Sequence, residues 1–303
     1  MKKIQLILFL REINDPRSLR FNDHDNDLLI RQARHANLLS RIATILSESN
    51  SLGSFGELHQ LQLNNAIKVS HANARSARWE IVDTYKILSQ EKISFIVLKG
   101  GAYIWLNNNA SKGRLFGDTD ILIKKNELSG AEKMLSHNRW VTTKLDAYDQ
   151  HFYRDWMHEI PPLHHLERHT SLDVHHSIIP PIIKNKFKIE HLWQCAVEDE
   201  KNPGLYTLHP LDMILHSATH LFHEGEFDNG LRDLVDLDAL LKEHIIPLDI
   251  WGKLLERAHQ LDLSIYLYHT LILCEHILKT PVSAQILLDI TRQNKVCLLY
   301  TSD

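Results

Sequence analysis

A change of hydrophobic period near the middle of the chain places the strongest constraint on its fold. The run from Ile93 to Leu98 is short, apolar and rich in β-branched residues, and Lys99-Gly100-Gly101 stops it. Such a run is typical of a buried strand, and the glycines are typical of a turn. Residues 102–107 then predict a short helix, so this part of the chain indicates a strand, a glycine turn and a helix.

The next predicted strand carries two aspartates. Gly117 precedes the segment 118–123, in which Asp118 and Asp120 are separated by one residue. Because the side chains of a strand alternate, both carboxylates point to the same face. Two carboxylates so close repel each other unless a cation lies between them, and oxygen ligands of this kind suit Mg²⁺. The alternative is that the two aspartates are only solvent-exposed residues at the end of a strand.

A later segment, 171–177, predicts a strand that supplies a third carboxylate. By the same alternation, Asp173 and His175 share a face of this strand. If the strand pairs beside segment 118–123, three carboxylates converge, and three carboxylates can hold two metal ions. His175 can then orient a carboxylate or contact a phosphate.

The glycine turn can contact a phosphate. Gly100 and Gly101 let backbone N–H groups approach an anion, which the N-terminus of the following helix also favours. Lys99 can add a positive charge, and Arg114 can bind triphosphate oxygens with two parallel hydrogen bonds. The alternatives are an ordinary strand-to-helix turn and a solvated loop arginine.

Helical patterns flank this mixed segment, so we expect an α+β fold with a mixed β-sheet core between helical N- and C-terminal flanks. The expected division is a helical region over 1–72, a core over 73–180 and a helical domain over 181–295. Residues 296–303 break the preceding pattern and resemble translated sequencing-adapter sequence, so they stay outside the fold prediction. Helices are predicted over 26–48, 72–90, 127–137, 210–224, 231–243, 248–259 and 263–278, and further strands over 140–144, 151–154 and 164–169.

Charge and cysteine content narrow the class of protein. The net charge of −4 gives no basic footprint, so nucleic acid is not expected as a partner. The three cysteines are far apart and form no C-x-x-C pair, which fits a reducing cytoplasm better than a disulfide framework. The apolar run 4–10 is too short for a typical secretion signal, and no longer run suits a membrane span. We therefore expect a cytoplasmic protein without a membrane partner.

The segments around these strands resemble a known family. Segments 97–102, 114–123 and 171–175 are together similar to the uncharacterised nucleotidyltransferase family of the nucleotidyltransferase-fold, or polymerase beta-like, superfamily. Segments 208–220 and 231–236 resemble the C-terminal helices of that family. The likeness covers roughly residues 80–245.

The resemblance implies a nucleotidyltransferase-like mixed sheet, two Mg²⁺ ions, and transfer of a nucleoside monophosphate from a nucleoside triphosphate to a hydroxyl-bearing acceptor. ATP is the expected donor, and the acceptor is a small molecule or a protein side chain. Carried onto this chain, Asp118 and Asp120 bind metal, and Asp173 binds metal and helps to deprotonate the acceptor. On this basis we expect Asp120→Asn to remove activity with little loss of stability. One departure is Lys99, which stands where the superfamily usually has an apolar residue before the glycines.

Two other functions compete with this one. One is a noncatalytic nucleotide-binding or regulatory module of the same fold. The other is a zinc-dependent hydrolase built on His216, His220 and Asp236, because two histidines four residues apart share one face of a helix and can chelate zinc. Ser217 stands where a metalloprotease helix has glutamate, and the two histidines could also serve only to pack the helix against the sheet.

Overall fold

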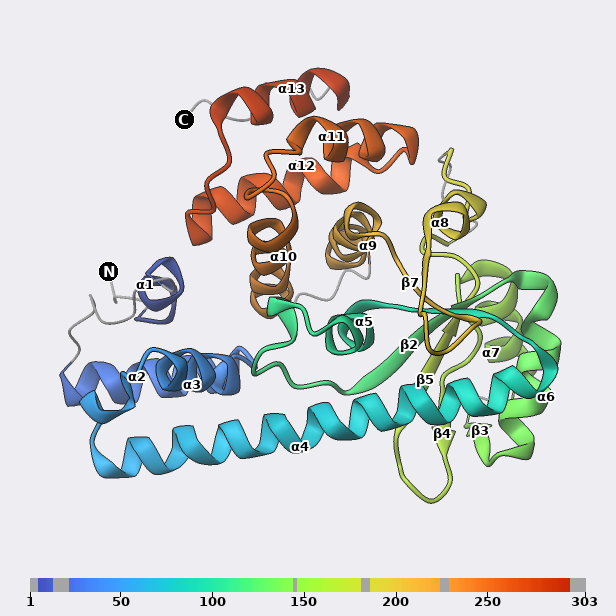
Figure 1. The fold of residues 1–303 in the computed structure, drawn as a ribbon, viewed down its shortest axis with the longest axis horizontal. Coiled ribbons are helices and arrows are strands. Elements are labelled where there is room, and N and C mark those ends of the chain that lie inside the picture. The colour runs from blue at the N-terminus through green and yellow to red at the C-terminus, as the bar shows by residue number, and fades with distance from the viewer. Residues whose placement is uncertain (1–4, 13–21, 144–145, 181–185, 224–228, 295–303) are drawn as a thin grey trace.

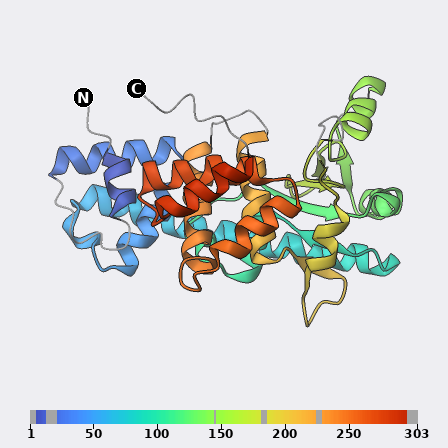
Figure 2. The same cartoon turned by 90° about the horizontal axis from the view of Figure 1, so that it is seen from above.

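The sheet sits at one end of an elongated molecule. The computed structural model describes residues 5–12, 22–143, 146–180, 186–223 and 229–294. Within these residues, seven strands form one mixed sheet in the order β3-β4-β5-β2-β1-β7-β6. The first three helices lie at the opposite end, and the long helix α4 (Glu57–Leu88) runs between the two ends (Figures 1 and 2). The predicted α+β architecture with helical flanks is therefore present.

The three strands at the centre of the sheet carry the predicted motifs. The strand β1 (Phe95–Val97) pairs antiparallel with β2 (Asp118–Ile123), and β2 pairs in parallel with β5 (Ser171–His175). Asp118 at the start of β2 is exposed, and the residues that follow it on the strand are buried. Burial of each large aliphatic side chain stabilises the sheet by roughly 1.5–3 kcal/mol. The outer strands are β3 (Trp140–Thr142), β4 (Leu163–His165), β6 (Val197–Glu198) and β7 (Leu205–Thr207).

Helices surround the sheet and fill the rest of the molecule. The helix α4 contacts α3 near its start and contacts α5 and α6 further along, while α9 packs against α5 (Figure 1). The remaining α-helices are α1 (Gln5–Arg11), α2 (Asp23–His35), α3 (Leu39–Glu48), α5 (Lys99–Leu106), α6 (Leu128–His137), α7 (Ala147–His151), α8 (Glu190–Cys195), α9 (Pro210–His223), α10 (Gly230–His244), α11 (Trp251–Gln260), α12 (Ser264–Leu273) and α13 (Ala284–Asn294).

Two helix predictions need correction at the N-terminal end. The predicted helix 26–48 is two helices, because the chain breaks at 36–38, where Asn37 adopts a left-handed φ of 54°. Asparagine tolerates that conformation and often ends a helix. The predicted helix 72–90 begins earlier, at Glu57, directly after the serine- and glycine-rich stretch.

The predicted strand 151–154 is wrong, because this segment is helical. It covers the end of α7 and part of a π-helical turn, Phe152–Trp156. Aromatic residues favour strands in general, but here Tyr148 and Phe152 stack at helical spacing, with ring centroids 6.3 Å apart. Arg154 also donates to Gln150, one turn earlier, at 3.0 Å.

The sheet extends past residue 180, because β7 pairs in parallel with β1 and β6 pairs with β7. The apolar run near the N-terminus forms α1, and its Leu6, Phe9 and Leu10 are buried in the core. Among the described residues, no helix combines the length and apolar character needed to cross a membrane. The segment 296–303, with Cys297, lies outside the described residues.

Candidate active site

Parallel pairing of β2 with β5 brings the three predicted carboxylates to one face of the sheet. Asp120 lies in register with Asp173, and Asp118 lies in register with Ser171. Paired strands are about 4.8 Å apart, and side chains at paired positions point the same way. Asp118 is exposed, Asp173 is half-buried and Asp120 is buried. The strand pairing that the sequence analysis required is therefore present.

The three carboxylates perturb one another. Burial, followed by the charges of Asp120 and Asp118, raises the pKa of Asp173 to about 7. The charge of Asp120 raises the pKa of Asp118. Although burial acts to raise the pKa of Asp120, Lys99 and the hydrogen bond from His175 hold it well below its usual value. The cluster therefore contains one carboxylate that is held ionised, Asp120, and one that resists ionisation, Asp173.

Lys99 and His175 both contact Asp120. The Lys99 Nζ atom lies 2.9 Å from Asp120 Oδ1, and His175 Nε2 lies 3.0 Å from the same oxygen. Lys99 begins α5 with a φ of 43°, a left-handed conformation that costs energy for a residue other than glycine and often marks a functional site. Lys99 thus neutralises a carboxylate in this structure, and its predicted contact with a phosphate stays a prediction.

The two glycines let α5 pack closely against its neighbours. A Cβ atom on Gly100 would lie 2.5 Å from Arg114 Nη1 and 2.6 Å from Phe116 Cδ1. A Cβ atom on Gly101 would lie 2.9 Å from Val97 Cγ1. The helix begins without a side-chain cap, so its first N–H groups keep the anion-binding character of a helix N-terminus. Tight packing explains both glycines, and phosphate binding at this turn stays a prediction.

Arg114 makes its strongest contact with the C-terminal helix α10. Its Nε atom donates to Asp236 Oδ2 at 2.6 Å, and its Nη2 atom lies 3.7 Å from Asp233 Oδ1. Arg41 donates to the other oxygen of Asp236. Two arginines therefore hold Asp236, which removes it as a ligand from the zinc site proposed with His216 and His220, so that alternative was wrong in its third residue. Triphosphate binding by Arg114 stays a prediction.

The helix α9 brings two histidines near the carboxylates. The Tyr103 hydroxyl on α5 and Ser217 Oγ on α9 are 2.6 Å apart, which fixes how α9 faces α5. Burial, followed by the charge of Lys99, lowers the pKa of His216 well below its usual value. His216 is buried, and its Nδ1 atom has no hydrogen-bond partner among the described residues. The charge of His220 contributes to the low pKa of Asp120, so both histidines lie close to the Lys99–Asp120 pair.

Sequence reasoning missed two residues that extend this cluster, His158 and Glu159. Glu159 Oε2 lies 3.2 Å from His175 Nδ1, and the His158 ring stacks on the His175 ring with centroids 5.3 Å apart. An isolated antiparallel bridge between Glu159 and His175 creates these contacts. The only local signal in the sequence was that His158 and Glu159 are adjacent polar residues shortly before the prolines 161–162. This signal does not reveal that they lie beside β5.

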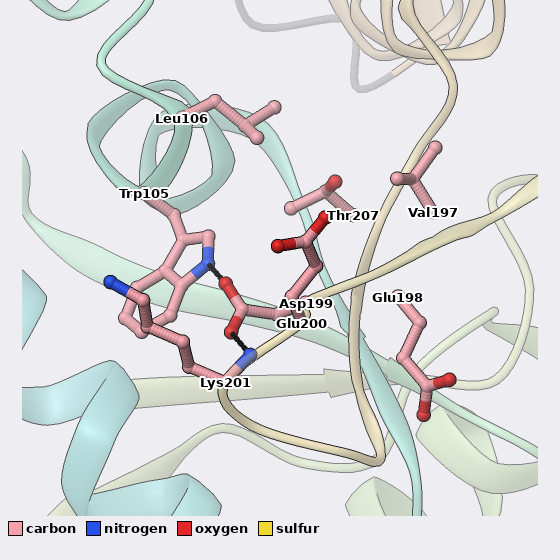
Figure 3. A pocket seen from close by; sticks show the side chains of 8 residues that line it. All are labelled: Trp105, Leu106, Val197, Glu198, Asp199, Glu200, Lys201 and Thr207. Carbon is pink, nitrogen blue, oxygen red and sulfur yellow. Dashed lines mark hydrogen bonds between the residues drawn. The ribbon is translucent and has the colours of Figure 1, made fainter.

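A separate hollow lies beyond the C-terminal end of α5 (Figure 3). Within it, Trp105 Nε1 donates to Asp199 Oδ2 at 2.9 Å, and the Lys201 backbone N–H donates to Asp199 Oδ1 at 3.0 Å. Its lining residues include none of the predicted site residues, so this hollow is distinct from the carboxylate cluster. The lining residues are Trp105, Leu106, Val197, Glu198, Asp199, Glu200, Lys201 and Thr207.

Comparison with known proteins bears on the identity of the chain. A search of curated proteins gave no match. A family described as uncharacterised nucleotidyltransferase matches residues 22–279. This range contains the whole described sheet, the carboxylate cluster and the helices from α2 to α12, and it extends beyond both ends of the 80–245 region in which the sequence showed a resemblance. The chain therefore belongs to the uncharacterised nucleotidyltransferase family.

Proposed function

We propose that this protein transfers a nucleoside monophosphate from a nucleoside triphosphate, with ATP as the expected donor, to a hydroxyl-bearing acceptor. The observation that carries the proposal is the β2–β5 register, which sets Asp173 beside Asp120 and two residues from Asp118. We further propose that the sheet with its helices is the nucleotidyltransferase fold, that the acceptor is a small molecule or a protein side chain, and that the reaction takes place in the cytoplasm.

The carboxylates fit Mg²⁺. Burial, followed by repulsion from the neighbouring carboxylates, raises the pKa of Asp173 to about 7, and a cation between the side chains would relieve that repulsion. Their oxygen atoms are ligands that Mg²⁺ prefers. Two bound Mg²⁺ ions would neutralise the triphosphate oxygens and the charge that develops on departing pyrophosphate. Asp118, Asp120 and Asp173 would hold these ions.

The chain's own residues would position the reactants and move one proton. The Asp173 carboxylate would take the proton of the acceptor hydroxyl. The acceptor oxygen would then bond to the α-phosphorus as the bond from that phosphorus to the pyrophosphate oxygen breaks. Lys99 and the N-terminus of α5 would bind phosphate oxygens, with Arg114 nearby. His175, hydrogen-bonded to Asp120, would keep that carboxylate oriented.

Label transfer tests this function. The protein is incubated with Mg²⁺, cell extract and each nucleoside triphosphate in turn, labelled at the α-phosphate or the γ-phosphate. We expect the α label, and not the γ label, to appear in an acceptor. Asp118→Asn removes a proposed metal ligand and should lower the transfer by orders of magnitude. The variant should still fold, because an exposed strand end contributes little to the core. Exposed Glu91→Gln is the matched control. Full transfer by Asp118→Asn would show that the metal assignment is wrong.

One observation supports a noncatalytic nucleotide-binding module as a second candidate. The Lys99 ammonium already neutralises Asp120 at 2.9 Å, so a lysine could replace a metal ion in a module that only binds nucleotide. Equilibrium binding of ATP in the presence of a chelator separates the two functions. Tight binding that needs no Mg²⁺, together with no label transfer, favours the module.

A further inference from the structure

Two histidines and a glutamate gather beside the carboxylate cluster, at the end of β5. His158, Glu159 and His175 each offer one ligand atom, and these atoms all lie within 4.8 Å of one another. His158 and His175 are buried, and the Glu159 side chain is 17% exposed. Imidazole nitrogen and carboxylate oxygen together form a ligand set for transition metals, unlike the all-oxygen set of the three aspartates.

Backbone hydrogen bonds hold this group in place without any ion. The carbonyl oxygen of His158 accepts from His176 N at 2.8 Å and from Ser177 N at 3.1 Å. Ile160 N donates to Val174 O at 3.0 Å. The segment that carries His158 and Glu159 is therefore fixed against β5, which means that little conformational freedom is lost when the three side chains bind one ion.

The spacing of the ligand atoms suits a tetrahedral ion. Metal–ligand bonds of about 2.0–2.1 Å at tetrahedral angles place ligand atoms roughly 3.3 Å apart. His175 Nδ1 and Glu159 Oε2 already lie 3.2 Å apart. The His158 ring is stacked on His175 at an interplanar angle of 20°, so His158 must turn about χ2 to direct a nitrogen at the same ion. That torsion is soft.

The other nitrogen of His175 is already held by a carboxylate. Its Nε2 atom lies 3.0 Å from Asp120 Oδ1, which leaves Nδ1 facing Glu159. Histidine ligands of metals commonly donate their second ring N–H to a carboxylate, which fixes the tautomer and the ring orientation. Asp120 would supply that contact here.

We propose that His158, Glu159 and His175 bind one transition-metal ion of the Zn²⁺ class, at a site separate from the three aspartates. Two histidines and a glutamate leave a fourth position open to water or another ligand. The ion joins the segment 158–160 to β5 and fixes the orientation of His175 toward Asp120. The proposal does not depend on nucleotidyl transfer, because a protein that only binds nucleotide could also carry this site.

A cluster without metal would have a different cause. A protonated His175 between Glu159 and Asp120 would form two ion pairs and would need no other cation. The two explanations predict different responses to Zn²⁺. A proton on His175 Nδ1 and a metal ion compete for the same nitrogen, so a cluster held by protonated His175 would not bind Zn²⁺.

Metal binding by the full chain tests the proposal. Chelator-treated protein is first dialysed into excess Mg²⁺, which would occupy the aspartates. It is then titrated with Zn²⁺ and with Co²⁺, and the bound Zn²⁺ or Co²⁺ is counted after dialysis by mass spectrometry. We expect one Zn²⁺ per chain and the visible absorption of tetrahedral Co²⁺. His158→Ala and Glu159→Gln should each weaken Zn²⁺ binding by about 10-fold or more, a loss of the size that even outer contacts of metal sites cause. Glu159→Gln keeps the shape of the side chain, so it remains informative if His158→Ala folds poorly.

Two controls separate this site from the aspartates and from surface histidines. Asp118→Asn and exposed His137→Ala should leave Zn²⁺ binding unchanged. Absence of Zn²⁺ binding by the unaltered chain would overturn the proposal. Unchanged Zn²⁺ affinity in folded Glu159→Gln would also overturn it. Weaker Zn²⁺ binding by Asp118→Asn would overturn it too, because it would show that the ion binds at the aspartates.

Discussion

At the scale of single residues, the surroundings of Asp120 differ from what an aspartate pair in sequence suggests. The alternation of a strand correctly predicted which side chains share a face. It could not predict that Lys99 would turn to Asp120, or that Arg114 would turn to Asp236, because those partners are set by packing between distant segments. The Lys99–Asp120 pair also changes one expectation, since Asp120→Asn would remove a buried carboxylate that pairs with the half-buried Lys99 ammonium and would cost stability.

The raised pKa of Asp173 predicts how stability depends on pH without metal. Its folded-state pKa of about 7 lies above the unfolded value near 3.9, so between these values the folded state holds a proton that the unfolded state has lost. The free energy of unfolding should therefore fall as pH rises from about 4 to about 7 and level off above pH 7. In Asp173→Asn this contribution disappears, so the amount by which its melting temperature exceeds that of the unaltered chain should grow from about pH 4 to about pH 7 and stay constant above that. Thermal unfolding in chelator across this range checks it, and parallel curves for the two proteins would refute it.

At the scale of elements, the helices α9, α10 and α11 and the aspartate strand were predictable because each is periodic over its own length. The strand β7 was not, since three residues gain their extended form by pairing with β1 more than a hundred residues earlier. The same limit explains why Glu159 was missed as a neighbour of His175. The helix α9 was predicted as an element, but its position beside Lys99 was not. That position depends on the contact between Tyr103 and Ser217, which the sequence does not reveal.

The position of α9 predicts different roles for its two histidines. We expect half-buried His220→Ala to weaken binding of Mg²⁺ and ATP with little loss of stability, because this side chain lies near Asp120. Buried His216→Ala should lower stability instead. Melting temperature and nucleotide affinity are measured separately, with exposed His259→Ala on α11 as control. Lost stability with unchanged affinity and turnover in His220→Ala would leave this histidine with a packing role only.

At the scale of the whole molecule, one buried ion-pair network joins distant parts of the chain. Asp236 on α10 accepts from Arg41 on α3 and from Arg114 in the loop before β2. The side chains of Arg41 and Asp236 are 5% and 3% exposed, so their charges are compensated by each other and not by water. The network holds the N-terminal helices, the strand with the aspartates and the C-terminal helices in one arrangement.

Removal of one charge from this network should destabilise the whole chain. Asp236→Asn leaves the buried Arg41 guanidinium against a neutral side chain and removes the nearer partner of Arg114. Breaking a buried pair of this kind costs about 3–5 kcal/mol. The control is Asp27→Asn, whose pair with Arg31 on α2 is exposed and worth about 0.5 kcal/mol or less. Urea unfolding followed by circular dichroism measures both. Equal stability of the two variants would mean that the network contributes nothing to folding.

The central claim is that Asp118, Asp120 and Asp173 hold divalent metal beside a bound triphosphate. Crystals grown with Mn²⁺ and a non-hydrolysable ATP analogue test it most directly, because Mn²⁺ replaces Mg²⁺ at oxygen ligands and gives an anomalous signal. The account predicts anomalous peaks within bonding distance of these three carboxylates and phosphate oxygens near the N-terminus of α5. Ordered analogue elsewhere on the chain, with no Mn²⁺ peak at the aspartates, would contradict it.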